Sequence, residues 1–284
     1  LETIERIEII KGPAARVFGQ NAFTGAVNIV TKKDYSTKGT AEIGGGSFGQ
    51  IRAELSLGKR SEKGGIFAHF SRLSSEGYRY NTDFKNSTAF IQARLAEQGK
   101  MPLDILGFFS GRKFGANGFY ASADAKDQYE ETEASLIAVQ SKVQKGNWIL
   151  KPNLYWRRGQ DHYLYLRNQP EVYENWHITH KVGAGLNSSY TSSWGNTGLG
   201  VDLSHVSIAS NNLGYRSRQL VTLFMEHQFI LGKRLDLTPG IAVNYYSDFG
   251  GFAYPGIDLG FQISTNWTAY ANLGYTYRIP TYTD

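Results

Sequence analysis

The chain of 284 residues contains 18 tyrosines, 16 phenylalanines, 32 glycines, 7 prolines and no cysteine, and its net charge is +5. The lack of cysteine excludes a disulfide framework, a thiolate metal site and a cysteine nucleophile. Basic residues are scattered among acidic ones rather than clustered, so no nucleic-acid partner is predicted. No apolar run approaches the ~18 residues of a membrane helix, whereas abundant aromatics and glycines suit many strands joined by tight turns.

The first predicted element is a pair of strands joined by a connector rich in glycine and alanine. Residues 4–10, "IERIEII", alternate Ile7 and Ile9 with Arg6 and Glu8, and residues 26–32, "AVNIVTK", form the second strand. The sequence "KGP" at 11–13 turns the chain, and glycines at positions 19 and 25 permit close backbone approach. We interpret this segment as a small α+β piece of a domain whose remainder lies upstream.

From residue 39 onward, apolar and polar residues alternate with a period of two. The pattern is seen in "IRAEL" (51–55), "AFIQARL" (89–95), "LDLTPGIAVNYY" (235–246) and "WTAYANLGY" (267–275). Such alternation gives each strand one apolar and one polar face. About thirteen segments of this kind are predicted, many longer than the ~5–6 residues typical of globular strands. His205 and His227 interrupt the pattern, because both fall on apolar faces.

The predicted connections alternate between short and long. Short turns are expected at 58–65, 97–101, 144–147, 192–197, 231–234 and 264–266, and longer links at 74–87, 113–132, 161–178, 208–218 and 247–252. Outer-membrane barrels have short periplasmic turns and long extracellular loops. Trp148, Trp194 and Trp267 fall at or beside short turns, as in an interfacial aromatic belt. The alternative is a soluble β-sandwich or propeller, although thirteen strands exceed what one sandwich usually needs.

The strand count also predicts that the sequence is part of a longer barrel. If the first barrel strand rises, the thirteenth rises as well and ends near Arg278, at the extracellular rim. A sheet that stopped there would leave a full strand edge unpaired in lipid. We therefore expect further strands to complete the barrel.

The opening segment resembles a specific motif. The pattern I-E-R-I-E-I-I-K-G-P-x(5)-G-x-N-A-x-x-G-A-V-N-I-V-T-K is similar to the closing segment of the plug domain of TonB-dependent outer-membrane receptors. In that family the segment immediately precedes the first barrel strand, and Ala15 stands where many members carry Ser. The resemblance implies that residues 1–33 are the C-terminal end of a plug and that 34–284 are the N-terminal part of a barrel.

Four later stretches resemble barrel motifs of the vitamin B12 (cobalamin) branch of these receptors. They are "FGANGFYA", "YWRRGQDHY" (155–163), "YPGIDLGF" (254–261) and "GYTYRIPTYTD" (274–284). The last is similar to a family motif that falls partway round a 22-stranded barrel, and plugged barrels of this size are a known class. The expected fold is therefore all-β, an antiparallel transmembrane β-barrel in part, preceded by a piece of an α+β plug domain.

The resemblance implies an outer-membrane receptor that imports a scarce, large nutrient. Its partners would be cobalamin or a metal-chelate ligand, outer-membrane lipid, a TonB-type energy-transducing protein that acts through a segment upstream of the plug, and, as a further candidate, a surface lipoprotein. The sequence contains no phosphate-binding loop, so the energy is expected to come from the proton gradient. No chemistry on the substrate, no cofactor and no bound metal are predicted.

Two sets of candidate residues follow. The ligand is expected to contact aromatic and polar residues of the long loops, because aromatics give large contact area with little rotamer entropy to lose. These residues are Tyr78, Tyr80, Phe114, Asn117, Phe119, Tyr120, His162, Tyr163, Tyr165, Arg167, Tyr173, Trp176, Asn211, Asn212 and Tyr215. Contacts between plug and barrel wall are expected from Glu5, Arg6 and Glu8 on the plug and from Arg52, Glu54 and Arg94 on the wall. The alternatives are loop packing for the first set and local pairing for the second.

Other functions were weighed against this interpretation. "HITH" at 177–180 suggests a metal pair, but strand positions three apart face opposite sides. Asp161 and His162 are adjacent, so their side chains diverge, and the chain is predicted not to be an enzyme. A ferric-siderophore or haem receptor of the same class remains open. A passive porin would lack the plug motif, and a soluble carbohydrate-binding β-protein would lack long loops on one side.

Overall fold

The computed structural model describes residues 3–11, 25–32, 36, 38–232 and 234–283. Within this part of the chain, two antiparallel sheets are formed. The small sheet pairs β1 (Ile4–Lys11) with β2 (Gly25–Thr31). No helix in the described ranges is long and apolar enough to cross a membrane.

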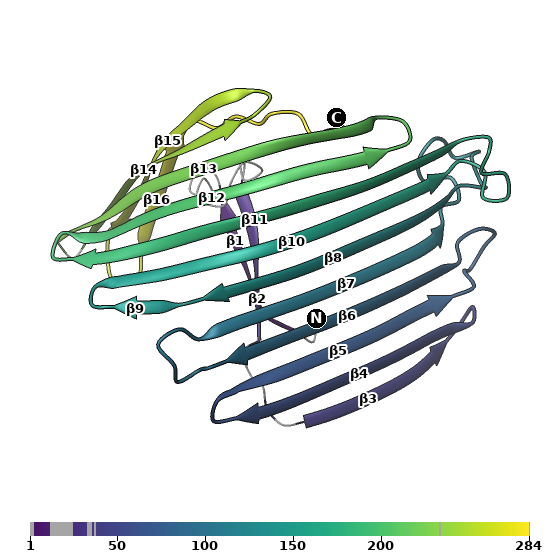
Figure 1. The fold of residues 1–284 in the computed structure, drawn as a ribbon, viewed down its shortest axis with the longest axis horizontal. Helices are drawn as coiled ribbons and strands as arrows, with labels where there is room; N and C mark the ends of the chain where they lie inside the picture. Colours follow the sequence, from purple (N-terminus) through teal and green to yellow (C-terminus); the bar gives the residue numbers. More distant parts are fainter. Residues whose placement is uncertain (1–2, 12–24, 33–35, 37, 233, 284) are drawn as a thin grey trace.

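The large sheet is one curved, continuous layer of antiparallel strands (Figure 1). Its strands are β3 (Lys38–Gly46), β4 (Gln50–Ser61), β5 (Gly64–Ser75), β6 (Phe84–Leu95), β7 (Leu103–Gly115), β8 (Tyr129–Ser141), β9 (Val143–Lys145), β10 (Trp148–Leu164), β11 (Glu174–Ser192), β12 (Gly195–Ser210), β13 (Gly214–Leu231), β14 (Leu235–Tyr246), β15 (Gly250–Gln262) and β16 (Thr268–Gly274). Each strand pairs with its neighbours in sequence, and the short β9 continues β8 along β10. The described sheet therefore has thirteen strands in succession, with β9 as a fourteenth beside β10.

Alternation along each strand gives the sheet two different faces. On the face called outer here, apolar side chains from neighbouring strands lie opposite one another, as Val201, Leu223 and Val243 do in the register of β12, β13 and β14. Leu223 is 51% exposed. The other face, called inner, carries polar side chains such as Thr222 and Asn244 of the same strands. A continuous apolar face open to the surroundings is the pattern of a transmembrane β-barrel wall.

The links between strands gather at two rims of the sheet. The rim called the loop rim carries the three long links, 76–83, 116–128 and 165–173, and the three-residue turns 47–49, 211–213 and 247–249. The opposite rim, called the turn rim, carries the other links. The predicted asymmetry is thus confirmed for the three longest links. The long links predicted at 161–178 and 208–218 were too long, because β10 to β13 stay paired beyond the point where their apolar alternation ends.

The tryptophans predicted to mark an interface lie at the turn rim. Trp148 begins β10 and its ring lies 4.8 Å from that of Tyr190, while Trp194 and Trp267 belong to the turns before β12 and β16. His205 and His227 lie on the outer face, as predicted, and His227 contacts the hydroxyl of Thr197 through Nδ1 at 2.8 Å. This partner satisfies one polar nitrogen of the imidazole on an otherwise apolar face.

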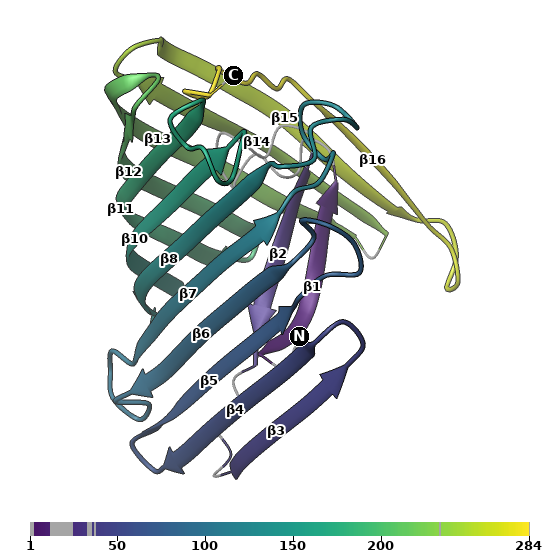
Figure 2. The same cartoon turned by 90° about the vertical axis from the view of Figure 1, so that its right-hand side faces the viewer.

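The β1–β2 hairpin lies on the concave side of the large sheet (Figure 2). Its register places Ile7 opposite Ile29 and Ile9 opposite Val27, and all four side chains are more than half exposed. The hairpin therefore carries an uncovered apolar face of its own. Both predicted strands are confirmed, while the predicted turn at "KGP" beyond Lys11 and the predicted close approach at Gly19 lie outside the described residues.

The inner face also supports the last described segment, 275–283. Ile279 is 5% exposed and packs in a small core with Leu220 of β13 and Tyr246 of β14. The ring of Phe252 lies parallel to that of Tyr277, with centroids 4.8 Å apart. This packing places residues 279–283 against the inner wall near β10 and β11.

Candidate functional site

A cavity of about 630 Å³ opens on the inner face beneath the loop rim. It is lined by Tyr120, Ala121, Glu130, Asp161, Tyr163, Tyr165, Tyr173, Asn175 and His177. These residues come from the link 116–128, the starts or ends of β8, β10 and β11, and the link 165–173. We call this cavity the tyrosine pocket.

Four of the predicted ligand-binding residues meet in the tyrosine pocket. The rings of Tyr120 and Tyr163 are 5.5 Å apart at 84°, and those of Tyr163 and Tyr173 are 6.4 Å apart at 69°. Tyr165 lies beside Tyr173, since its backbone N–H donates to the Tyr173 carbonyl at 3.1 Å. Edge-to-face aromatic contacts of this kind fix the rings, so the pocket is preorganised.

The pocket also contains polar residues that were not among the predicted ligand residues. Glu130 is 9% exposed and accepts a hydrogen bond from the hydroxyl of Tyr120. Asp161 lies opposite His177 in the register of β10 and β11, one inner-face row below Tyr163 and Asn175. The alternation of β10 would have revealed Asp161, because positions 161 and 163 share a face.

A second cavity of about 530 Å³ continues down the inner wall and shares Asp161 and His177 with the tyrosine pocket. Going down from that row, Gly159 lies opposite Thr179, and Arg157 lies opposite Lys181. Two cavities thus follow one pair of strands from the loop rim toward the middle of the wall.

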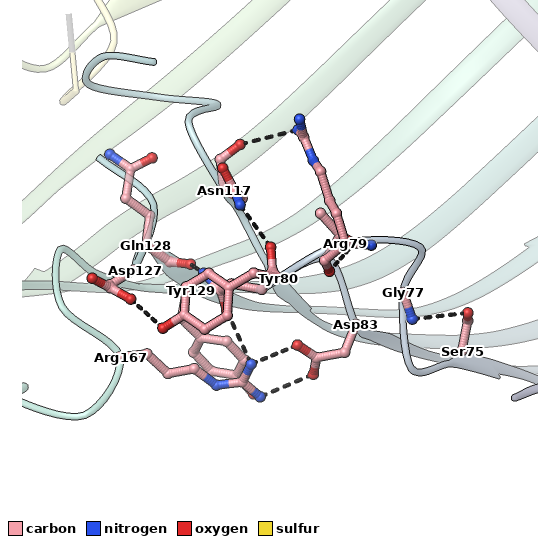
Figure 3. A network of polar contacts seen from close by, with 12 residues as sticks. Ser75, Gly77, Arg79, Tyr80, Asp83, Asn117, Asp127, Gln128, Tyr129 and Arg167 are labelled. Atoms are coloured by element: carbon pink, nitrogen blue, oxygen red, sulfur yellow. Dashed lines mark hydrogen bonds and ion pairs between the residues drawn. The ribbon is translucent and has the colours of Figure 1, made fainter. Parts of the chain in front are cut away.

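Beside the tyrosine pocket, the three long links are joined by a polar network (Figure 3). At its centre, the Arg167 guanidinium donates to both carboxylate oxygens of Asp83, at 2.6 and 3.0 Å, and to Oδ1 of Asn81 at 3.1 Å. The same guanidinium lies over the ring of Tyr129, 4.3 Å from its centroid. The hydrogen bonds from Arg167 lower the pKa of the Asp83 carboxyl, although burial acts in the opposite direction. The same bonds raise the pKa of the Arg167 guanidinium.

Further hydrogen bonds tie the links 76–83 and 116–128 together. Asn117 donates from Nδ2 to the Tyr80 carbonyl at 2.6 Å, and Asn81 donates from Nδ2 to the Gln128 carbonyl at 2.6 Å. The Tyr80 hydroxyl donates to Asp127, a bond that raises the pKa of Tyr80. In this structure, the predicted ligand residues Tyr80, Asn117 and Arg167 hold the loops together, which is the alternative that the sequence left open.

Three predicted ligand residues face away from the tyrosine pocket. His162 and Trp176 lie on the outer face, where their rings stack at 5.1 Å and His162 Nε2 lies 3.0 Å from Oε2 of Glu174. Tyr215 is also on the outer face and is 71% exposed. Together with Phe114 and Tyr163, these residues belong to strands rather than loops, which corrects their predicted location. Strand alternation continues to the rim, so neighbouring residues there point in opposite directions.

The remaining predicted ligand residues pack the rim. Tyr78 contacts Phe48 edge-to-face at 6.3 Å, and Phe119 contacts Tyr120 at 4.8 Å. Asn211 accepts from the Trp176 N–H at 2.9 Å through Oδ1, and Asn212 donates to Asn175. These two asparagines fasten the turn 211–213 to the start of β11.

The charges predicted to join plug and wall have local partners. In β1, Arg6 pairs with Glu5 and Glu8 at 2.6 and 2.7 Å. On the barrel wall, Arg52 pairs with Glu54 at 2.9 Å, and Arg94 pairs with Asp104 at 2.6 Å. Contacts between the two parts through these residues therefore remain a prediction.

The two sequence features weighed for other chemistry are separated by the strand geometry. His177 faces the inner side of β11, whereas His180 faces the outer side and stacks on Trp156 at 6.0 Å. Asp161 lies in the inner cavities, whereas its neighbour His162 bonds to Glu174 on the outer face. Neither pair has the convergent geometry that metal binding or nucleophilic catalysis requires.

A curved antiparallel sheet with an apolar outer face, long links at one rim and a polar cavity on its inner side defines a segment of an outer-membrane β-barrel. Residues 34–284 match the family model described as TonB dependent receptor-like, beta-barrel, and the chain belongs to this family. Members of the family are outer-membrane proteins of Gram-negative bacteria and act as receptors or transporters rather than as enzymes.

Two relatives of this chain are named for different ligands. The vitamin B12 transporter BtuB of Vibrio vulnificus is 22% identical over 302 aligned residues, covering 99% of this chain and 48% of BtuB. The metal-pseudopaline receptor CntO of Pseudomonas aeruginosa is 34% identical over 92 residues, which are 32% of this chain and 13% of CntO. The chain thus spans about half the length of BtuB and a smaller part of CntO.

Solved structures support the fold. The siderophore receptor PirA from Pseudomonas aeruginosa superposes with a TM-score of 0.77 at 18% identity, over 99% of this chain and 50% of PirA. The copper transporter OprC superposes with a TM-score of 0.79 at 11% identity, over 99% of this chain and 52% of OprC. The predicted all-β barrel fold is confirmed.

Proposed function

We propose that the chain is part of an outer-membrane receptor that imports a scarce, large nutrient with energy supplied through a TonB-type protein. The proposal is supported by the family, by the lipid-compatible outer face and by a preorganised pocket on the inner side of the loop rim. Binding on that side would put the ligand at the entrance of the barrel lumen. The energy-transducing protein, and a surface lipoprotein if the receptor uses one, would act on other parts of the receptor.

Residues 1–33 would then be the C-terminal end of a plug, with the barrel wall beginning at residue 34. The separate β1–β2 sheet on the concave side of the wall supports this division. The exposed apolar face around Ile9 and Val27 also supports it, since such a face needs a covering layer to be stable in water.

The first candidate substrate is cobalamin or a related corrinoid. Its support is the similarity to the vitamin B12 transporter BtuB, which extends over 99% of this chain. A metal chelate is the second candidate, because the stretch of 92 residues shared with the metal-pseudopaline receptor CntO has the higher identity, 34%. The siderophore receptor PirA and the copper transporter OprC share the fold.

The observation that carries the proposal is the convergence of Tyr120, Tyr163, Tyr165 and Tyr173 in one pocket with Glu130 and Asp161. Aromatic rings offer large contact surfaces, while the carboxyl groups and Asn175 orient a ligand rich in amide or hydroxyl donors. A corrinoid that carries amide side chains suits this combination.

The test is growth of a strain that lacks the receptor, complemented with the full-length gene. Complementation on limiting cobalamin supports the first candidate, whereas normal cobalamin growth of the deletion strain together with failed iron uptake overturns it in favour of a chelate. Tyr163→Ala should weaken uptake about 2- to 10-fold, because an aromatic contact contributes ~0.5–1.5 kcal/mol. Tyr215→Ala, on the outer face of the same rim, is the matched control and should leave uptake unchanged.

A further inference from the structure

The second cavity contains an unusual arrangement of charge. Arg157 of β10 and Lys181 of β11 are directly opposite each other in the ladder, and both side chains face the inner cavity of about 530 Å³. Within the described part of the chain, no ion pair is formed by either residue, although Lys181 lies over the ring of Tyr155 at 5.6 Å. Like charges directly opposite each other destabilise a sheet, although the carboxylate of Asp202 on β12 attracts Lys181 and offsets part of this repulsion.

The surroundings leave room for a ligand next to the two cations. One row above, Gly159 lies opposite Thr179, and the position where Gly159 lacks a side chain has no atom within 4 Å. Thr179 adds a hydroxyl to the lining of the same cavity. Two cations and a hydroxyl around open space form the donor set that binds an oxyanion.

Nearby charged residues have other partners or lie in other rows. Arg218 also lines the cavity, but it pairs with Asp248 at 2.8 Å and donates to the Pro280 carbonyl. Asp202 accepts from the Tyr155 hydroxyl at 3.3 Å. Asp161 lies two rows above Arg157, about 13 Å farther along the strand. The Arg157–Lys181 row therefore presents net positive charge to the cavity.

We propose that Arg157 and Lys181 form an anion-binding subsite for a phosphate or carboxylate group carried by the imported ligand. This inference rests on the proposed function, and it narrows the substrate to a molecule with a donor-rich or aromatic face and a separate anionic group. The tyrosine pocket holds the first part, and the anion reaches the cation pair through the cavity that shares Asp161 and His177 with that pocket. Electrostatic attraction in a partly enclosed cleft also draws an anionic ligand inward.

The direct test uses inorganic phosphate as probe. The full-length receptor is purified in a maltoside detergent, and the ³¹P line width of phosphate is measured as receptor is added at low salt. Wild-type protein should broaden the line, Arg157→Gln and Lys181→Gln should each weaken apparent affinity about tenfold, and the double variant should abolish the effect. Excess chloride should reduce the broadening by screening.

Arg112→Gln is the matched control. Arg112 is an exposed arginine on the same inner face, but it lies between Asn86 and Thr132 in the ladder rather than beside a second cation. It should leave the broadening unchanged. No broadening with wild type, or equal broadening with the double variant, overturns the subsite.

A second measurement separates this inference from the proposed function. Cyanocobalamin carries a phosphodiester and cobinamide lacks it, so Arg157→Gln should weaken binding of the first and not of the second. If wild-type protein binds neither corrinoid, the cobalamin assignment fails and the phosphate titration alone decides the subsite. If wild type binds both and Arg157→Gln changes neither affinity, the subsite fails while the receptor function stands. Far-ultraviolet circular dichroism of each variant verifies that the barrel is folded.

Discussion

Replacing Arg167 by alanine should loosen the three long links at the loop rim without unfolding the sheet. The guanidinium makes a two-bond contact with Asp83, at 2.6 and 3.0 Å, and a third bond to Asn81 at 3.1 Å. These contacts join residues more than 80 positions apart in sequence, from links that have few buried apolar contacts of their own.

The free energy lost in Arg167→Ala can be estimated from the geometry and the exposure of its contacts. A hydrogen bond to a charged group contributes ~1.5–3 kcal/mol when it is buried, but an exposed ion pair contributes only ~0–1 kcal/mol. The side chains of Arg167 and Asp83 are 35% and 33% exposed, so the free energy that their ion pair contributes lies between these two values. With the contact to the Tyr129 ring, which adds ~0.5–1 kcal/mol, we expect a total of roughly 1–2 kcal/mol. This corresponds to a roughly 5- to 30-fold increase in local opening.

Hydrogen exchange measures that opening directly. The informative amides are those that bridge the links, including Arg167, which donates to the Asp127 carbonyl at 2.8 Å, and Asn117, which donates to the Asn81 carbonyl at 3.3 Å. Their exchange should accelerate in Arg167→Ala, while amides in the middle of β10 stay protected.

Two controls make the result specific. Arg167→Lys keeps the charge but loses the bidentate geometry, so the exchange rates of these amides should lie between those of wild type and Arg167→Ala. Lys113→Ala removes another rim ion pair, with Glu131 at 2.7 Å on the outer face, and should leave these amides unchanged. Equal exchange in wild type and Arg167→Ala would refute the reasoning that this contact holds the rim.

Three further predictions concern the wall and the rim. Leu223 lies at the middle of the outer face of β13, so Leu223→Arg should lower the free energy of unfolding in lipid by ~2–4 kcal/mol. Urea unfolding measures this change, and Leu223→Ala should lower the free energy of unfolding by less. Gly200→Ala places a Cβ against the ring of Phe224 and should lower the free energy of unfolding by ~1–3 kcal/mol. The Cβ added by Gly251→Ala meets no atom within 4 Å, so this variant should lose far less stability in the same assay. The pKa of Asp83 is lowered in the folded protein, so its stabilising effect is complete above the reference value of 3.8 and is lost as pH falls through the folded pKa. Carboxyl ¹³C NMR should give that folded pKa below 3.8, and a value above 3.8 would contradict the pairing.

The rim network also bears on how the pocket works. Arg167 and Tyr173 belong to the same link, 165–173, so the polar network and the tyrosine pocket share one backbone segment. Holding that link in place keeps the Tyr173 ring near Tyr163 before the ligand arrives. Preorganisation of this kind lowers the entropic cost of binding.

The strands could be predicted from the sequence because their signal is local. Alternation such as that of "IRAEL" requires only that one face meet an apolar and the other a polar environment, and consecutive pairing then follows from short turns. The motif at 4–32 likewise predicted a two-stranded element, and both strands form. The limits of β10 to β13 were predicted less well, because near the loop rim apolar residues such as Val206 and Ile208 of β12 lie on the inner face, so the regular alternation is lost although the pairing continues.

The candidate site was predicted only in part, for a related reason. Composition identified tyrosines near the loops, and Tyr120, Tyr163, Tyr165 and Tyr173 do meet. Composition could not distinguish Tyr163 from its neighbour His162, which faces the opposite side of the wall.

The sequence by itself determined that this protein is a wall of amphipathic strands with long links gathered on one side, because a period of two and the position of turns are properties of neighbouring residues. Only the tertiary structure decided which side chains converge. Arg157 and Lys181 are separated by more than twenty residues in sequence, and it is the register of β10 on β11 that makes them neighbours. Register depends on the whole ladder of hydrogen bonds between two strands, and a shift of one residue would turn every side chain of the site to the other face.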